Sequence, residues 1–149
     1  MDTKPDKKDE ALYQVIWLIR RLFRALAQKS SENLSAFGIS VADRAVMEFL
    51  YPEKKMSVPE IAEQYKVSRQ HVQATVNSLH AQGLVETHDN PRHKRSSHIQ
   101  LTEKGRKLFA TVLRKDEQVI QQLFSHLSES DVQITHRTLK SILVKLDEE

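Results

Sequence analysis

Residues 57–101 read SVPEIAEQYKVSRQHVQATVNSLHAQGLVETHDNPRHKRSSHIQL, and the predicted fold follows from the patterns in this segment. Ser57 and Glu60 have the spacing of a capping box, in which each side chain bonds the backbone of the other residue at the start of a helix. The pattern predicts one helix over residues 58–65 and, after a short break, a second helix that begins at Ser68. Two helices joined by such a tight turn are typical of a helix-turn-helix motif.

After Gly83, a residue suited to the left-handed end of the second helix, the apolar residues no longer follow a helical period. Val85 and Thr87, and later Ile99 and Leu101, alternate with polar neighbours, as they would in two strands. The segment between these runs, DNPRHKRS, is polar and rich in turn residues, which predicts the tip of a β-hairpin. A helix-turn-helix followed by a hairpin is the winged helix-turn-helix plan, and such a motif lays its second helix in the major groove of DNA.

The second helix has two distinct faces when its residues are placed at 100° intervals. Val72, Val76 and Leu79 fall together and are predicted to pack inward. Amides can pair with adenine and guanidinium groups with guanine, while a helix N-terminus suits a phosphate. The residues predicted to contact DNA from this helix are Ser68, Arg69, Gln70, Gln73 and Asn77.

Cations gather at the hairpin tip and directly after the hairpin. Arg92, Lys94 and Arg95 are predicted to contact DNA as a wing, because arginine suits the narrow and electronegative minor groove. The next helix begins with three more cations, for which two interpretations stay open: contacts with the DNA backbone, or ordinary solvated charge. These are Lys104, Arg106 and Lys107.

Long helices are predicted on both sides of this lobe. Apolar residues recur at three- and four-residue steps from Ala11 to about Leu34, and two helices follow Thr102 and Ser128. A shorter helix follows Ser40. The predicted fold class is therefore mainly α with a small β-hairpin: a winged helix-turn-helix lobe plus N- and C-terminal dimerisation helices.

The predicted organisation has four parts. These are a flexible N-terminus over residues 1–10, dimerisation helices over 11–36 and 106–147, and a DNA-binding lobe over 40–105. The apolar stripes at the two ends exceed what one small lobe can cover, which indicates a homodimer. The predicted interface residues are Leu12, Ile16, Ile19, Leu139, Ile142, Leu143 and Leu146.

Composition narrows the function classes. Residues 40–114 carry twelve basic and eight acidic side chains, which suits a polyanionic partner, and the chain has no cysteine. The seven histidines lack the spacing of a metal site, so neither a metal nor another cofactor is predicted. The start of the sequence has no signal-peptide pattern and no window suits a membrane span, so a cytoplasmic protein without membrane contact is expected. No nucleophile elbow, phosphate loop or apolar carboxylate pair suggests an enzyme.

The chain resembles the MarR family (multiple-antibiotic-resistance regulators) over about residues 11–147. The resemblance rests on four stretches: SVPEIA at 57–62, the run from Val67 to Val85, NPRHKRS at 90–96, and IQLTEKG at 99–105. It implies a triangular dimer in which two winged lobes straddle a pseudo-palindrome.

The resemblance also assigns roles to single residues. The family's wing carries Asp-x-Arg, in which the arginine enters the minor groove. That arginine is Arg95 here, whereas His93 stands at the aspartate position and leaves Asp89 as a substitute brace. Small aromatic or anionic effectors often release family members from DNA. The implied effector pocket comprises Tyr13, Trp17, Arg20, Arg21 and Phe37, for which packing and a solvated helix face are the alternatives.

The predicted function is sequence-specific regulation of transcription by a homodimer on double-stranded DNA, in the manner of a repressor released by a small-molecule effector. The alternative is a winged helix that binds a protein partner and no operator. Salt dependence separates the two interpretations, because phosphate contacts release counterions and a protein interface does so far less.

Overall fold

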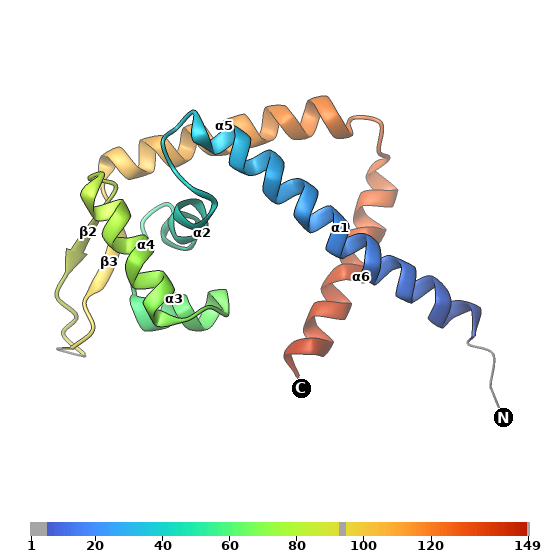
Figure 1. The fold of residues 1–149 in the computed structure, drawn as a ribbon, viewed down its shortest axis with the longest axis horizontal. Helices are drawn as coiled ribbons and strands as arrows, with labels where there is room; N and C mark the ends of the chain where they lie inside the picture. The colour runs from blue at the N-terminus through green and yellow to red at the C-terminus, as the bar shows by residue number, and fades with distance from the viewer. Residues whose placement is uncertain (1–5, 93–94, 149) are drawn as a thin grey trace. The chain divides into compact units, whose positions relative to one another are not determined.

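The computed structural model describes residues 6–92 and 95–148 of the chain, which falls into two compact units, residues 1–112 and 113–149. Most described residues are helical, and a small antiparallel sheet accompanies them (Figure 1). This confirms the predicted fold class. The elements are α1 (Lys7–Ser35), α2 (Val41–Leu50), β1 (Met56–Ser57), α3 (Val58–Tyr65), α4 (Arg69–Ala81), β2 (Val85–His88), β3 (His98–Leu101), α5 (Glu103–Phe124) and α6 (Glu129–Asp147).

Hydrogen bonds from serine side chains fix the starts of the short helices. At α3, Ser57 Oγ accepts the Glu60 N–H at 3.3 Å and Glu60 Oε2 accepts the Ser57 N–H at 2.9 Å. Ser40 and Asp43 form the same reciprocal pair at α2, with both distances 3.0 Å. The pair at Ser57 confirms the capping box predicted from its spacing, and the pair at Ser40 starts the helix predicted to follow Ser40. Helix α1 starts at Lys7, earlier than the predicted Ala11, and acidic residues in its first turn suit the helix dipole.

The sheet has one strand that the sequence pattern did not predict. Strand β1 pairs with β3, which also pairs with β2, so the order is β1-β3-β2. Met56 lies opposite Ile99, and both side chains are buried. A strand of two residues is too short to show an alternating pattern, so periodicity could not reveal it.

Burial fixes the rotation of α4. Val72, Val76 and Leu79 have exposed fractions of 0%, 2% and 0%, which confirms that this face points inward. They belong to a core that includes Leu50 of α2 and Ile61 of α3, each fully buried. Complete burial of one such side chain contributes about 1.5–3 kcal/mol, so turning α4 to expose this face would be strongly unfavourable. The opposite face of α4 is therefore held toward solvent.

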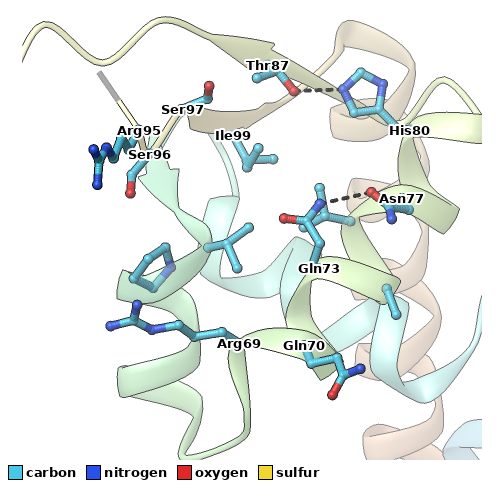
Figure 2. Close-up of a pocket in the computed structure, with 14 residues that line it drawn as sticks. Arg69, Gln70, Gln73, Asn77, His80, Thr87, Arg95, Ser96, Ser97 and Ile99 are labelled. Carbon is cyan, nitrogen blue, oxygen red and sulfur yellow. Dashed lines mark hydrogen bonds between the residues drawn. The ribbon is translucent and has the colours of Figure 1, made fainter. Parts of the chain in front are cut away.

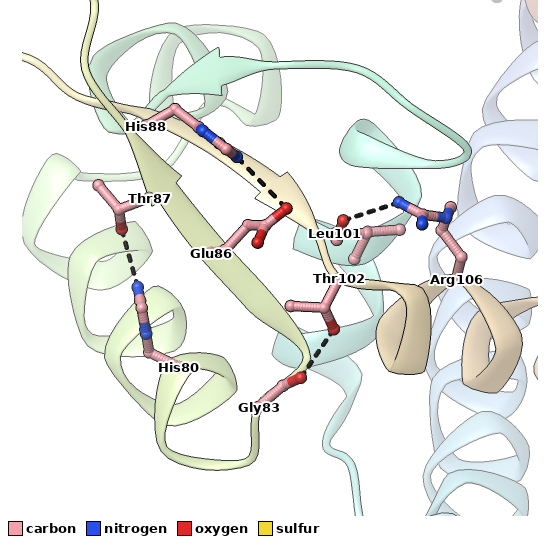
Figure 3. Close-up of polar contacts among 8 residues, drawn as sticks. All are labelled: His80, Gly83, Glu86, Thr87, His88, Leu101, Thr102 and Arg106. Atoms are coloured by element: carbon pink, nitrogen blue, oxygen red, sulfur yellow. Dashed lines mark hydrogen bonds and ion pairs between the residues drawn. The ribbon is translucent and has the colours of Figure 1, made fainter.

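The base of the hairpin is fastened to the start of α5 by Thr102 (Figure 3). Its hydroxyl donates to the Gly83 carbonyl at 2.7 Å and accepts the Gly105 N–H at 3.1 Å. Its own N–H donates to the Leu84 carbonyl at 3.0 Å. One residue thus joins the turn before β2 to the first turn of α5. Among the described residues, no helix is long and apolar enough to cross a membrane.

Replacing Gly105 by alanine is expected to destabilise the lobe. A Cβ at this position would overlap the Leu84 carbonyl oxygen, so the backbone around the Thr102 bonds must shift. We expect a loss of about 1–3 kcal/mol in the free energy of unfolding, measured by urea titration.

The matched control is Gly83→Asn. Gly83 has φ +70 and open space where a Cβ would stand, and asparagine tolerates this left-handed conformation. Equal losses for the two variants would contradict the close approach at Gly105.

Candidate nucleic-acid interface

A groove of about 770 Å³ lies between the exposed face of α4 and the hairpin (Figure 2). Helix α4 lines it with Arg69, Gln70, Gln73, Ala74, Val76, Asn77 and His80. The hairpin contributes Thr87, Arg95, Ser96, Ser97 and Ile99, and the first turn of α3 contributes Val58 and Pro59. Three segments thus build one concavity on the winged lobe, and its lining combines polar and apolar side chains.

Four of the five residues predicted on α4 come together in this groove. Arg69, Gln70, Gln73 and Asn77 are all exposed and all line it. Ser68 is exposed but does not line the groove, and its Oγ accepts the His71 N–H at 3.0 Å. The structure therefore gives Ser68 a capping function at the N-terminus of α4.

The two predicted wing cations that the structure describes, Arg92 and Arg95, have different positions. Arg95 lines the groove and is exposed. Arg92 is exposed and outside the lining, and its backbone N–H donates to Oδ1 of the buried Asn90 at 3.0 Å. Lys94 and His93 lie outside the described residues. Arg95 is thus the predicted wing residue that the structure brings next to α4.

The lining of the groove is cationic. It contains the guanidinium groups of Arg69 and Arg95 and no carboxylate among the residues that the structure describes. Figure 2 shows both guanidinium groups extending toward the same side of the groove. Asp89, the candidate brace for Arg95, has no ion pair with Arg95 in the described part of the chain.

Several groove residues were not predicted from the sequence. His80 and Thr87 connect α4 to β2, with His80 Nε2 and Thr87 Oγ1 2.8 Å apart (Figures 2 and 3). Ser96 and Ser97 add hydroxyl groups from the returning side of the hairpin. The alternation along β2 could have revealed Thr87. It puts Val85 and Thr87 on the same face of the strand, and Thr87 contacts α4 from that face.

The cations at the start of α5 bind groups of the protein itself. Lys104 Nζ donates to the Gln82 carbonyl at 2.8 Å, and an Arg106 guanidinium N–H donates to the Leu101 carbonyl at 3.1 Å. Lys107 Nζ lies 3.2 Å from Glu103 Oε1. None of the three belongs to the described lining of the groove. These contacts favour the interpretation that the three cations stabilise the start of α5 and do not contact the DNA backbone.

The residues of the implied effector pocket do not meet within one chain. Arg21 stacks on Trp17, with the guanidinium carbon 4.7 Å from the ring centroid. Tyr13 and Arg20 lie on the same long helix, whereas Phe37 follows the end of that helix. The rise of an α-helix, about 1.5 Å per residue, puts Tyr13 about 30 Å from Phe37. Phe37 instead lines a separate cavity of about 370 Å³ with Gln82, Leu84, Lys104, Lys107, Leu108 and Thr111. The effector pocket stays a prediction.

Two histidines of the hairpin lie opposite each other. His88 and His98 are cross-strand partners, and His88 Nε2 lies 3.3 Å from Glu86 Oε1 (Figure 3). Across residues 6–92 and 95–148, no group of three or more histidine or acidic side chains has a geometry that could hold a metal ion.

Comparison with known proteins shows which family the winged lobe resembles. Residues 37–96 match the model of the MarR family. The chain is 26% identical over 151 residues to the transcriptional repressor MprA of Escherichia coli, covering 97% of this chain and 85% of MprA. It is 27% identical over 140 residues to an uncharacterized protein of Mycobacterium tuberculosis, covering 93% and 91% of the two chains. The relatives whose names state a role are transcription regulators and not enzymes.

Solved structures share the fold. The transcriptional regulator BldR of Sulfolobus solfataricus superposes with a TM-score of 0.83 at 22% identity, covering 95% of this chain and 99% of BldR. The MepR–DNA complex of S. aureus gives a TM-score of 0.77 at 23% identity, covering 87% and 96%. The winged helix-turn-helix architecture predicted from the sequence is thus the fold of known MarR-type regulators.

Two substitutions of Ser68 test whether its side chain stabilises the start of α4. Ser68→Ala removes the acceptor for the His71 N–H and should lower the free energy of unfolding by about 1 kcal/mol. Ser68→Asp keeps an acceptor at the helix start and should retain most of the stability. Urea titration of both variants measures this difference, and an alanine variant as stable as the wild type would contradict the capping role.

Proposed function

We propose that this chain, whose residues 37–96 match the model of the MarR family, is a sequence-specific regulator of transcription that binds double-stranded DNA. The observation that carries the proposal is the groove between α4 and the hairpin. It combines two guanidinium groups, three exposed amides and no carboxylate among its described lining residues. Guanidinium groups and amides are the side chains that bind phosphates and read base edges.

The proposed docking follows from the position of each element. Helix α4 enters the major groove, whose width of about 12 Å admits a helix, with the face that carries Gln70, Gln73 and Asn77 toward the bases. Arg69 stands at the start of this face. The wing places Arg95 toward the adjacent minor groove, where the potential is most negative. Arg92 and Lys94 complete the proposed wing contact, and the N-terminus of α4 with Ser68 meets the backbone.

We further propose a homodimer that joins through the helices at the two ends of the chain. Large apolar side chains on these helices stay exposed in a single chain: Leu34 is the one buried residue described on α1, and none is described on α6. The exposed fraction is 36% for Ile16 and 60% for Leu143. Exposed apolar surface on this scale marks an interaction surface. Two lobes related by a two-fold axis then match a pseudo-palindromic operator. The proposed interface comprises Leu12, Ile16, Ile19, Leu139, Ile142, Leu143 and Leu146.

The proposed repressor role is supported by the names of similar proteins. The E. coli relative MprA is named a transcriptional repressor, and a neighbouring structure of Streptococcus pneumoniae FabT contains DNA. We propose that this chain acts as a repressor in the cytoplasm, where it meets its operator. Release by a small aromatic or anionic effector belongs to the same proposal. The stacked Trp17 and Arg21 support it, because this pair offers both an aromatic surface and a cation.

Binding to DNA is expected to be salt-dependent and to require the groove arginines. Equilibrium titrations by fluorescence anisotropy, with duplex DNA from the gene's upstream region, should give a steep negative slope of log K against log salt. Arg69→Ala and Arg95→Ala should each weaken binding by about 1.5–3 kcal/mol, because each removes a hydrogen bond from a charged group to DNA. Lys107→Ala is the matched control, because Lys107 pairs with Glu103 and lies outside the groove.

A binding constant that hardly changes with salt, or a Lys107→Ala variant as impaired as Arg95→Ala, would contradict this docking. The first result would favour the alternative function, a winged helix that binds a protein partner. Capture of partners with wild type and Arg95→Ala would then be the next experiment.

The proposed interface predicts the effect of a charge on α6. Leu143→Glu should convert a dimer into a chain of 17.2 kDa in sedimentation velocity, because the carboxylate would have to be buried between subunits. Lys140→Glu adds a carboxylate at an exposed position one turn earlier and is the control for charge alone. A Leu143→Glu variant that sediments like the wild type would remove Leu143 from the interface.

A further inference from the structure

Two amides on the exposed face of α4 are bonded to each other. Gln73 Nε2 donates to Asn77 Oδ1 at 2.9 Å (Figure 2). Residues four positions apart on a helix are neighbours on one face, so the bond costs neither side chain a strained conformation. Both residues are exposed and both line the groove. Gln70, one turn earlier in the same groove, has no side-chain hydrogen bond within the described part of the chain.

The bond leaves Gln73 with the atoms that adenine requires. A primary amide has one oxygen and two N–H groups, and the N–H on the same side as the oxygen acts with it toward a base. The other N–H points away from that edge and is available to Asn77. Adenine offers an N6–H donor and the N7 acceptor in the major groove, which match the free acceptor and donor of a glutamine.

The same bond changes what Asn77 can do. Its oxygen already accepts the Gln73 N–H through one of its two lone pairs, so its unshared groups are the second lone pair and the two N–H donors of its nitrogen. A two-bond contact from Asn77 to its own adenine would have to share the oxygen that holds Gln73, and the side chain would have to satisfy both partners in one orientation. The two amides thus differ in role, although the residue types are alike.

We infer that Asn77 is a positioning residue, which holds the Gln73 amide in the orientation for a two-bond contact with one adenine in each half-site. The inference rests on the proposed function, since it concerns how the same groove reads DNA. A free glutamine side chain loses rotational freedom when it binds a base. A glutamine that is already held loses less, and its specificity rises because the wrong orientation is excluded.

The test measures base discrimination and not affinity alone. The probe is a duplex that wild-type protein selects from a random library, and fluorescence anisotropy gives Kd at one fixed salt concentration. Each adenine of one half-site is replaced in turn, by guanine with its paired cytosine and by 7-deazaadenine, which lacks the N7 acceptor. We expect one position at which wild type discriminates against guanine by about 5- to 100-fold and also loses affinity for 7-deazaadenine.

Four variants then separate the roles. Gln73→Ala should lose the discrimination at that position, and Asn77→Ala should lose most of it at the same position. Asn77→Asp keeps an acceptor for the Gln73 N–H, so it should restore the ratio of the two Kd values. The added charge weakens binding to both duplexes alike and therefore cancels in this ratio. Gln64→Ala is the matched control and should keep the ratio, because Gln64 is an exposed glutamine of α3 outside the groove lining. All three side chains are exposed, and thermal melting by circular dichroism checks that each variant is folded.

Three results would overturn the inference alone: full discrimination in Asn77→Ala, loss in Asn77→Asp as large as in Asn77→Ala, or loss at a second position that Asn77 reads by itself. Each of these leaves the proposed function intact, because wild type still selects a sequence. Wild-type protein that binds all duplexes equally would overturn the proposed function and this inference with it.

Discussion

Burial of one face of α4 determines how the winged lobe is arranged. Val72, Val76 and Leu79 lie almost fully inside the lobe, and the helix cannot rotate without exposing them. Their burial has two consequences. It stabilises the packing of α4 against α2 and α3, and it determines which side chains stay outside. The amides and the guanidinium group of α4 are presented to the groove because the apolar side chains of the same helix are held in the core.

The groove itself depends on the second element, the hairpin, being held at α4. Two contacts do this: His80 with Thr87, and Thr102 with Gly83. Each joins a helix to the hairpin or to the turn before it. Neither contact is large in energy, since a net hydrogen bond contributes about 0.5–1.5 kcal/mol. Their importance is geometric, because they help to position Arg95 beside α4, although Arg95 follows Arg69 by twenty-six residues in the sequence.

Local patterns in the sequence predicted most of the fold, and the gaps have physical causes. Capping serines marked helix starts, because Ser57 and Ser68 leave a signature of side chain and spacing. The inward face of α4 followed from helical periodicity. Strand β1 escaped prediction because two residues cannot display a period. Of the predicted site, the face of α4 was recoverable for the same reason as its core face. Ser96, Ser97 and His80 were not, because their place in the groove depends on how the hairpin folds back, which no local pattern encodes.

The strand order has a consequence for contacts between lobes. Strand β3 is paired on both sides, so the edges of the sheet are β1, with two residues, and β2, with four. Glu86 and His88 further make β2 a polar edge. Short polar edges are poor templates for strand addition by another chain. Two lobes in close contact therefore offer each other no long strand edge to extend.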